Sequence, residues 1–141
     1  MTDAARFVER FGDIWQEPQP ERYRDLWTED GLLLHPGMDE PLPWQGIADY
    51  VRAILEIAPD LRLRVDRWAS GDDFVLIEWT ITATFRDQPL EWSGVDRFSL
   101  RGDRATYGIA YFDTLPLWAR VDPDMDRGSP LEQAAGASGD S

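Results

Sequence analysis

Cysteine is missing from this chain of 141 residues, and lysine and asparagine are missing too. Without cysteine the chain cannot form a disulfide scaffold, a thiolate zinc site, an iron–sulfur cluster or a cysteine nucleophile. Without lysine it cannot form a Schiff base, attach pyridoxal phosphate or supply the lysine of a Walker phosphate loop. These absences exclude several large classes of enzyme chemistry.

Positive charge is also scarce. Fourteen basic residues stand against 27 acidic ones, so the net charge is −13 and the sequence pI is about 4.3. Nucleic acid is not expected as a partner, because each phosphate contact needs a local positive charge. The sequence has no apolar run of about 18 residues, and its N-terminus lacks the apolar segment of a signal peptide. We therefore expect a cytoplasmic protein with no membrane span.

The order of the predicted elements indicates an α+β fold. Apolar residues at helical spacing predict helices over 4–16, from Pro20 onward and over 47–58, with Asp3 as the first N-cap. Alternating apolar and polar residues predict strands over 32–35, from 61 onward, and over 74–85, 90–101 and 104–113. Short turns make the last three strands an antiparallel meander. We expect N-terminal helices packed on a curved, mainly antiparallel sheet.

Composition divides the chain into a domain over residues 1–121 and an acidic tail over residues 122–141. The chain is 43% hydrophobic and has seven tryptophans, which is ample for a packed core in the domain. The tail consists largely of Asp, Gly, Ser and Ala, so it has little apolar surface to bury. We expect the tail to be disordered.

Asp96 is the most informative carboxylate in the sequence, because the pattern of its strand places it on the apolar face. In that pattern Asp96 shares the apolar face of strand 90–101 with Trp92, Gly94 and Phe98. A carboxyl on such a face either accepts several hydrogen bonds or rises in pKa and stays protonated. Gly94 leaves space on the same face that a ligand could fill. A register shift at a bulge, or a carboxyl bound to a buried Tyr or Trp, is the structural alternative.

His35 is the only histidine and ends the predicted strand 32–35 beside a Pro- and Gly-rich loop over residues 36–46. Its reference pKa of about 6.5 suits proton transfer near neutrality. The structural alternative is a histidine that caps the end of a strand. One histidine cannot build a zinc site, and residues 1–121 contain no HxH or DxD pattern, although a ring of Asp and Glu is left open. We predict no metal and no cofactor.

Seven tryptophans, four tyrosines and six phenylalanines exceed what a small α+β core needs. Most must be plain core, but a cavity walled by flat rings would hold a small, flat hydrophobic ligand. We expect Tyr111 and Asp113 to reach this cavity from one face of the last strand. The full set predicted to bind the ligand is Phe11, Trp27, Trp44, Tyr50, Trp79, Tyr111 and Asp113. The Thr-rich outer face of strand 74–85 predicts a homodimer through the sheet.

This layout resembles the SnoaL-like branch of the NTF2-like superfamily, which includes polyketide cyclases, ketosteroid isomerases and limonene epoxide hydrolases. The resemblance covers about residues 5–117. It rests on the segment TEDG at 28–31, on the Gly-Ile pair at 46–47, and on GVDRF at 94–98 with YFD at 111–113. It implies a cone in which a bent sheet wraps around helices.

The resemblance also implies roles for individual residues. His35 and Pro36 fall where ketosteroid isomerases have a catalytic Asp-Pro, so His35 would replace the carboxylate base. Asp96 matches the protonated Asp of their oxyanion hole. Phe11 stands at the oxyanion Tyr and has no hydroxyl. The residues that perform epoxide hydrolysis are matched by Trp79, Ile81 and Ala110, which cannot do that chemistry.

We therefore predict a cofactor-independent isomerase, dehydratase or cyclase that abstracts a proton next to a carbonyl on a small hydrophobic ring. His35 would take the proton and Asp96 would hydrogen-bond the enolate oxygen. In polyketide cyclases an Asp is the acid/base, and either Asp96 or Asp113 could match it. One alternative is a non-catalytic small-molecule-binding or dimerising protein with the same pocket. Another is an accessory subunit whose exposed sheet face binds a partner protein.

Overall fold

The computed structural model describes residues 1–121, 131 and 134–136. The tail predicted over residues 122–141 lies almost wholly outside these described residues. Three helices precede the long strands: α1 (Asp3–Gln16), α2 (Pro20–Arg24) and α3 (Trp44–Ile57). A short helix, α4 (Leu115–Val121), follows the last strand.

The strands form a sheet with the order β2-β1-β6-β5-β4-β3. Their bounds are β1 (Trp27–Leu34), β2 (Leu42–Pro43), β3 (Arg62–Ser70), β4 (Phe74–Phe85), β5 (Gln88–Arg101) and β6 (Arg104–Phe112). Every pairing is antiparallel except β1 with β6, which is parallel. The predicted α+β class, the meander of β4, β5 and β6 and the mainly antiparallel sheet are confirmed.

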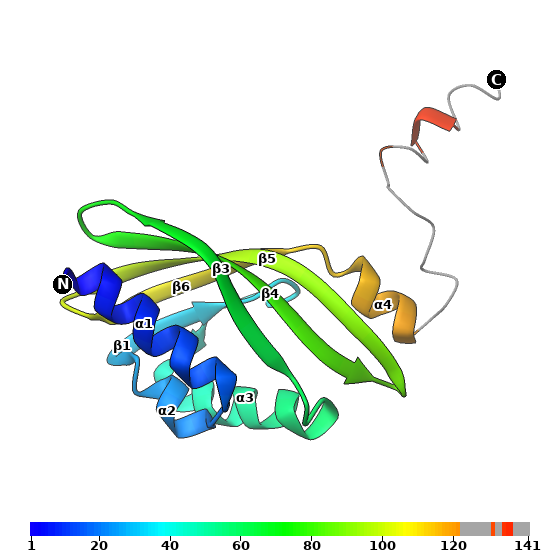
Figure 1. Ribbon diagram of the computed structural model, residues 1–141, viewed down its shortest axis with the longest axis horizontal. Helices are drawn as coiled ribbons and strands as arrows, with labels where there is room; N and C mark the ends of the chain where they lie inside the picture. The colour runs from blue at the N-terminus through cyan, green and yellow to red at the C-terminus, as the bar shows by residue number, and fades with distance from the viewer. Residues whose placement is uncertain (122–130, 132–133, 137–141) are drawn as a thin grey trace.

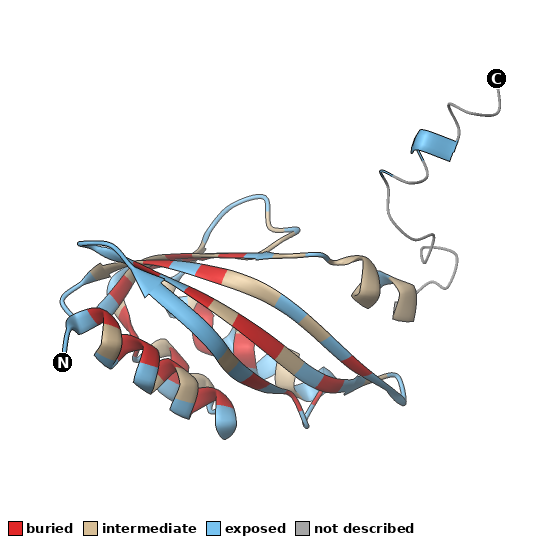
Figure 2. Ribbon diagram, turned by 45° about the horizontal axis from the view of Figure 1, so that its top comes forward, coloured by how far each residue is buried: buried red, intermediate tan, exposed pale blue. Residues whose placement is uncertain are grey.

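The helices α1, α2 and α3 lie on one side of the curved sheet, and the long strands arch over them (Figure 1). Buried residues recur along the strands where they face these helices (Figure 2). Near the N-terminal end of α1 this core is solid. The Phe98 ring lies 4.8 Å from that of Phe7, 5.5 Å from that of Phe11 and 5.6 Å from that of Trp27.

Several element boundaries differ from the sequence prediction. The N-cap of α1 is Thr2 rather than Asp3, because the Thr2 hydroxyl accepts a hydrogen bond from the Ala5 N–H at 3.1 Å. Residues 28–31, predicted as a turn, belong to β1 at a point where its pairing with β6 is irregular. Helix α3 begins at Trp44, inside the predicted loop, because Pro43 precedes its first turn in an extended conformation.

The outer face of the sheet carries the threonines of β4. The Thr80 hydroxyl donates to the Asp66 carboxylate at 2.6 Å and is 3.0 Å from the Ser93 hydroxyl oxygen. Leu76, on the same face, is partly exposed. Pairing of this face with a second copy stays a prediction. In the described part of the chain, no helix has both the length and the apolar character that crossing a membrane requires.

Candidate functional site

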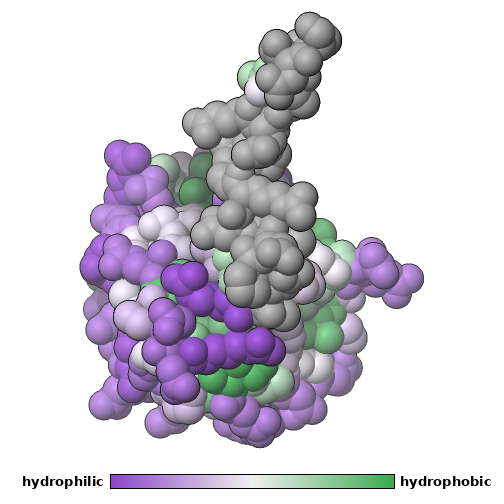
Figure 3. All heavy atoms as spheres, turned by 90° about the vertical axis from the view of Figure 1, so that its right-hand side faces the viewer, coloured by the Kyte–Doolittle hydropathy of each residue, from purple (hydrophilic) through white to green (hydrophobic). Residues whose placement is uncertain are grey.

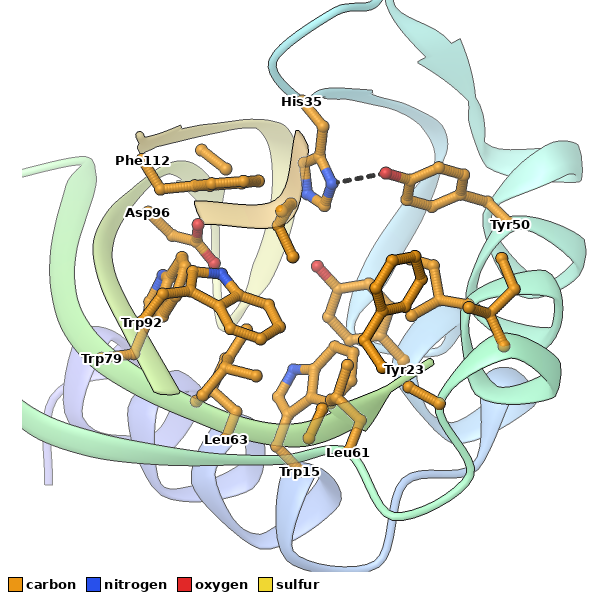
Figure 4. A pocket seen from close by; sticks show the side chains of 18 residues that line it. Trp15, Tyr23, His35, Tyr50, Leu61, Leu63, Trp79, Trp92, Asp96 and Phe112 are labelled. Carbon is orange, nitrogen blue, oxygen red and sulfur yellow. Dashed lines mark hydrogen bonds between the residues drawn. The ribbon is translucent and has the colours of Figure 1, made fainter. Parts of the chain in front are cut away.

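A cavity of about 250 Å³ lies between the helices and the inner face of the sheet, beyond the solid part of the core (Figure 4). Most of its lining is apolar. It is formed by Trp15, Tyr23, His35, Tyr50, Ile54, Ile57, Ala58, Leu61, Leu63, Trp79, Ile81, Ala83, Phe85, Trp92, Asp96, Ala110, Phe112 and Leu117. His35 and Asp96, which are 61 positions apart in the sequence, line this one cavity.

Asp96 projects inward from the middle of β5, where Ile77 of β4 and Ala110 of β6 flank it. Only 7% of the residue is exposed. Burial among apolar neighbours raises the pKa of Asp96 to about 7, and the nearby Trp79 indole lowers it slightly. The Trp79 Nε1 nevertheless has no hydrogen-bond partner of normal geometry among the described residues. Near and below neutral pH, Asp96 is thus an acid that can donate a hydrogen bond into the cavity.

His35 follows the last residue of β1, and two rings fix its position. Its Nδ1 is 2.8 Å from the Tyr50 hydroxyl oxygen on α3. The imidazole also meets the Phe112 ring of β6 edge to face, with centroids 6.4 Å apart. Burial lowers the pKa of His35 to about 4, because a charged imidazolium would lose its hydration there. At neutral pH His35 is therefore a neutral imidazole that can accept a proton.

Tyr23 of α2 is a cavity residue that sequence reasoning assigned to the core. Its hydroxyl points into the cavity (Figure 4). Burial raises the pKa of Tyr23 well above its ordinary value, and the neighbouring Asp96 and Tyr50 raise it further. The phenol therefore keeps its proton and remains a donor. A signal was available in the sequence, because a tyrosine on a buried helix face needs a partner for its hydroxyl.

Trp15 and Trp92 line the cavity as well, although neither was predicted to do so. Both belong to inward faces that the sequence pattern identified, so the pattern placed them in the interior without separating core from cavity wall. That separation depends on the distance between α1 and the sheet, which sequence periodicity does not contain.

The predicted site residues divide into two groups. His35, Tyr50, Trp79 and Asp96 line the cavity together. The other predicted residues are not among those that line it: Phe11, Trp27, Trp44, Tyr111 and Asp113.

Packing and strand register explain these differences. Phe11 and Trp27 are fully buried against Phe98 in the solid core. Trp44 opens α3 and lies under the Arg24 guanidinium, 4.9 Å from its ring centroid. Tyr111 is half exposed, because β6 turns its even-numbered residues near this end toward the cavity.

Asp113 lies beyond the end of β6 and is exposed. Its carboxylate accepts a hydrogen bond from the Leu115 N–H at 2.9 Å, at the start of α4. This local hydrogen bond directs Asp113 to a helix terminus rather than to a ligand. Of Asp96 and Asp113, between which the sequence left the choice of acid/base open, Asp96 is the one that lines the cavity.

Gly94 does not leave empty space for a ligand, as the sequence suggested. A Cβ at this position would lie 2.6 Å from Cζ2 of Trp79 and 2.7 Å from the Tyr111 carbonyl oxygen. The indole of Trp79 therefore occupies the room that the missing side chain leaves. There it meets the Phe112 ring, with centroids 5.7 Å apart. Gly94 shapes the cavity wall by letting two aromatic rings approach.

The cavity reaches the surface near the C-terminal end of α3. Ile57 of α3, which lines it there, is 62% exposed. Leu117 of α4, from the C-terminal part of the chain, also lines it. On the end of the molecule shown in Figure 3, hydrophobic atoms gather amid hydrophilic ones. Among the described residues, no cluster of three or more His, Asp or Glu could hold a metal ion. The cavity lining likewise includes no arginine.

This arrangement suits acid–base chemistry on an uncharged ring compound. A neutral imidazole and a protonated carboxyl line one apolar space, so one can accept a proton while the other donates to an oxygen. The low dielectric of the surroundings strengthens both interactions.

Comparisons with known proteins agree with this fold. The sequence profile of a family described as a SnoaL-like domain matches residues 8–108. No curated protein matches the sequence.

Solved structures share the fold at low identity. An NTF2-like protein of unknown function from Burkholderia pseudomallei is 14% identical, with a TM-score of 0.77 over 86% of this chain and 99% of that one. TerC, crystallised with polyporic acid, is 17% identical, with a TM-score of 0.75 over 86% and 99%. IdmH from Streptomyces antibioticus, proposed to be a polyketide cyclase, is 16% identical, with a TM-score of 0.71 over 84% and 97%.

Proposed function

The chain belongs to the SnoaL-like family, and from this membership and its cavity we propose that it is a cofactor-independent isomerase, dehydratase or cyclase. The reaction would begin with removal of a proton next to a carbonyl on a small hydrophobic ring. One observation carries the proposal: His35 and the buried carboxyl of Asp96 line the same apolar cavity. TerC, crystallised with polyporic acid, and IdmH, proposed to be a polyketide cyclase, have the same fold, and both support this substrate class.

The proposed first step is enolisation. His35 takes the proton from the carbon, and the electron pair of the C–H bond moves into the carbonyl, whose oxygen becomes negative. Asp96 donates a hydrogen bond to that oxygen, and the Tyr23 hydroxyl is placed to donate a second. The enolate then accepts a proton at another carbon, expels a β-hydroxyl group or attacks a second carbonyl. These outcomes are isomerisation, dehydration and cyclisation respectively.

The two pKa values set the pH window of this chemistry. His35 accepts a proton only when neutral, which holds above its pKa of about 4. Asp96 donates only when protonated, which holds below its pKa of about 7. Because His35 is a weaker base than free imidazole, the step depends on stabilisation of the enolate by Asp96 and Tyr23. We expect activity to be greatest between pH 4 and pH 7 and to fall above pH 7.

Exchange of α-protons for deuterium tests the proposal without the natural substrate. The full chain is incubated in D₂O near pD 6 with ring ketones such as 1-tetralone, and loss of the α-proton signal is followed by ¹H NMR. We expect saturable exchange. His35→Gln should abolish it, and Asp96→Ala should slow it by roughly 10²–10³, the usual cost of one oxyanion donor. Asp72→Asn, in the exposed turn between β3 and β4, is the control and should leave exchange unchanged.

The same experiment separates an enzyme from a binding protein. A non-catalytic protein would bind the ketones, as measured by calorimetry, but would not exchange their protons. His35→Gln would then leave affinity within a few-fold of the original. Wild-type exchange that survives in His35→Gln would refute the role of His35 as the base.

A further inference from the structure

We propose that Tyr50 is a positioning residue for His35. The Tyr50 hydroxyl keeps the proton of the neutral imidazole on Nδ1, so that Nε2 is free to accept a proton. Tyr50 was predicted from sequence to contact the ligand. Its hydroxyl oxygen lies 2.8 Å from Nδ1 of His35, within hydrogen-bond distance. This inference rests on the proposed function, in which His35 is the base.

The imidazole is held from two directions. The Tyr50 ring meets it edge to face, with centroids 5.2 Å apart, and the Phe112 ring meets it from β6 at 6.4 Å. These contacts come from α3 and β6, while His35 itself follows β1, so three elements determine the orientation of one ring. The ring is therefore placed before a ligand arrives, which is what efficient proton transfer requires.

The hydrogen bond with Tyr50 allows two arrangements. In one, the Tyr50 O–H donates to Nδ1 and the imidazole proton lies on Nε2. In the other, the Nδ1–H donates to the Tyr50 oxygen and Nε2 carries a free lone pair. Burial raises the pKa of Tyr50, so its hydroxyl keeps its proton in either case. Only the second arrangement lets His35 act as a base through Nε2.

The lining of the cavity favours the second arrangement. Tyr50 is only partly buried, and as a lining residue its own O–H can donate to water while its oxygen accepts from Nδ1–H. His35 has no other hydrogen bond from its ring to a side chain within the described residues. The Tyr50 hydroxyl is thus the group that decides between the two tautomers.

Nitrogen NMR of the single histidine tests this directly. Because the chain has one histidine, ¹⁵N-histidine labelling gives one pair of ring-nitrogen resonances, free of overlap. At pH 6.5 we expect Nδ1 to carry the proton and Nε2 to be bare. In Tyr50→Phe, which keeps the ring and removes the hydroxyl, both resonances should move toward the average of the two tautomers. A proton found on Nε2 in the wild type, or resonances unchanged in Tyr50→Phe, would overturn the inference.

Tyr23→Phe is the matched control, since it also removes a hydroxyl from the cavity wall but leaves the hydrogen bond to His35 intact. It should leave the histidine resonances within the wild-type pattern. In the deuterium-exchange assay, Tyr50→Phe should lower kcat by about ten- to a hundredfold with KM within about twofold. An equal rise in KM with unchanged kcat would show that Tyr50 binds the ligand instead, which also overturns the inference.

The two proposals can fail separately. If the wild-type protein exchanges no protons from any ketone, the proposed function fails, whatever the histidine resonances show. If exchange depends on His35 but the tautomer and its rate do not depend on Tyr50, the function stands and the positioning role is refuted.

Discussion

Replacing Asp96 by asparagine should stabilise the protein relative to the wild type, and this gain in the free energy of unfolding should grow as the pH rises. Asparagine is nearly the same size, and like a protonated carboxyl it is neutral and can donate. The pKa of Asp96 rises from 3.8 to about 7 on folding. Between these values the folded state holds a proton that the unfolded state has released, so raising the pH favours unfolding of the wild type.

The size of the effect follows from the same two numbers. One pH unit is worth about 1.4 kcal/mol for one proton. From pH 5 to pH 7 the wild type therefore loses about 2.3 kcal/mol that Asp96→Asn retains, and the loss levels off at about 2.7 kcal/mol by pH 8. Over the whole interval from 3.8 to about 7 the difference amounts to roughly 4 kcal/mol. The chain's acidic net charge affects both proteins equally, so it cancels in the comparison.

Urea unfolding at pH 5, 6, 7 and 8 measures this difference. We expect the free energy of unfolding of Asp96→Asn, minus that of the wild type, to grow by about 2.5–3 kcal/mol across the series. Asp72→Asn, on the exposed turn, should show no such trend. A flat difference for Asp96→Asn would mean that the carboxyl is ionised in the folded protein, and the role of Asp96 as a neutral donor would be refuted.

Two further substitutions test the packing around the site and on the outer face. Gly94→Ala should destabilise the protein by about 1–3 kcal/mol and weaken ketone binding, because Trp79 must move. Gly12→Ala, where the new Cβ meets ordinary contacts, should instead be neutral or stabilising in chemical unfolding. Thr80→Val should cost about 1 kcal/mol in the same assay by removing the hydrogen bond to Asp66, and equal loss in Thr80→Ser would contradict that cause.

The long strands and their facing were predictable because the alternation of side chains in a strand is a local property. Strand β4 has the predicted bounds, and its odd-numbered residues face the interior. The same alternation placed Asp96 inward. Register in an antiparallel meander with short turns is fixed by the chain itself, so little else was needed.

The end of β6 was not predictable in this way. The sequence assigns Tyr111 to the face opposite Ala110 and Phe112, but it does not say which face of the strand meets the helices. That is decided by pairing with β5, which sets Ala110 beside the inward-facing Asp96. Which face of a strand points inward therefore depends on the strands paired with it, here β5.

By itself, the sequence determined the α+β class, the meander, the inward position of Asp96 and the exclusion of cysteine and lysine chemistry. Only the tertiary structure decided that His35 and Asp96 share a cavity, that Tyr23 joins them, and that Phe11 and Trp27 fill the core instead. The physical reason is that periodicity distinguishes inside from outside, whereas a cavity depends on the gaps between elements. Those gaps are set by packing between residues far apart in the chain.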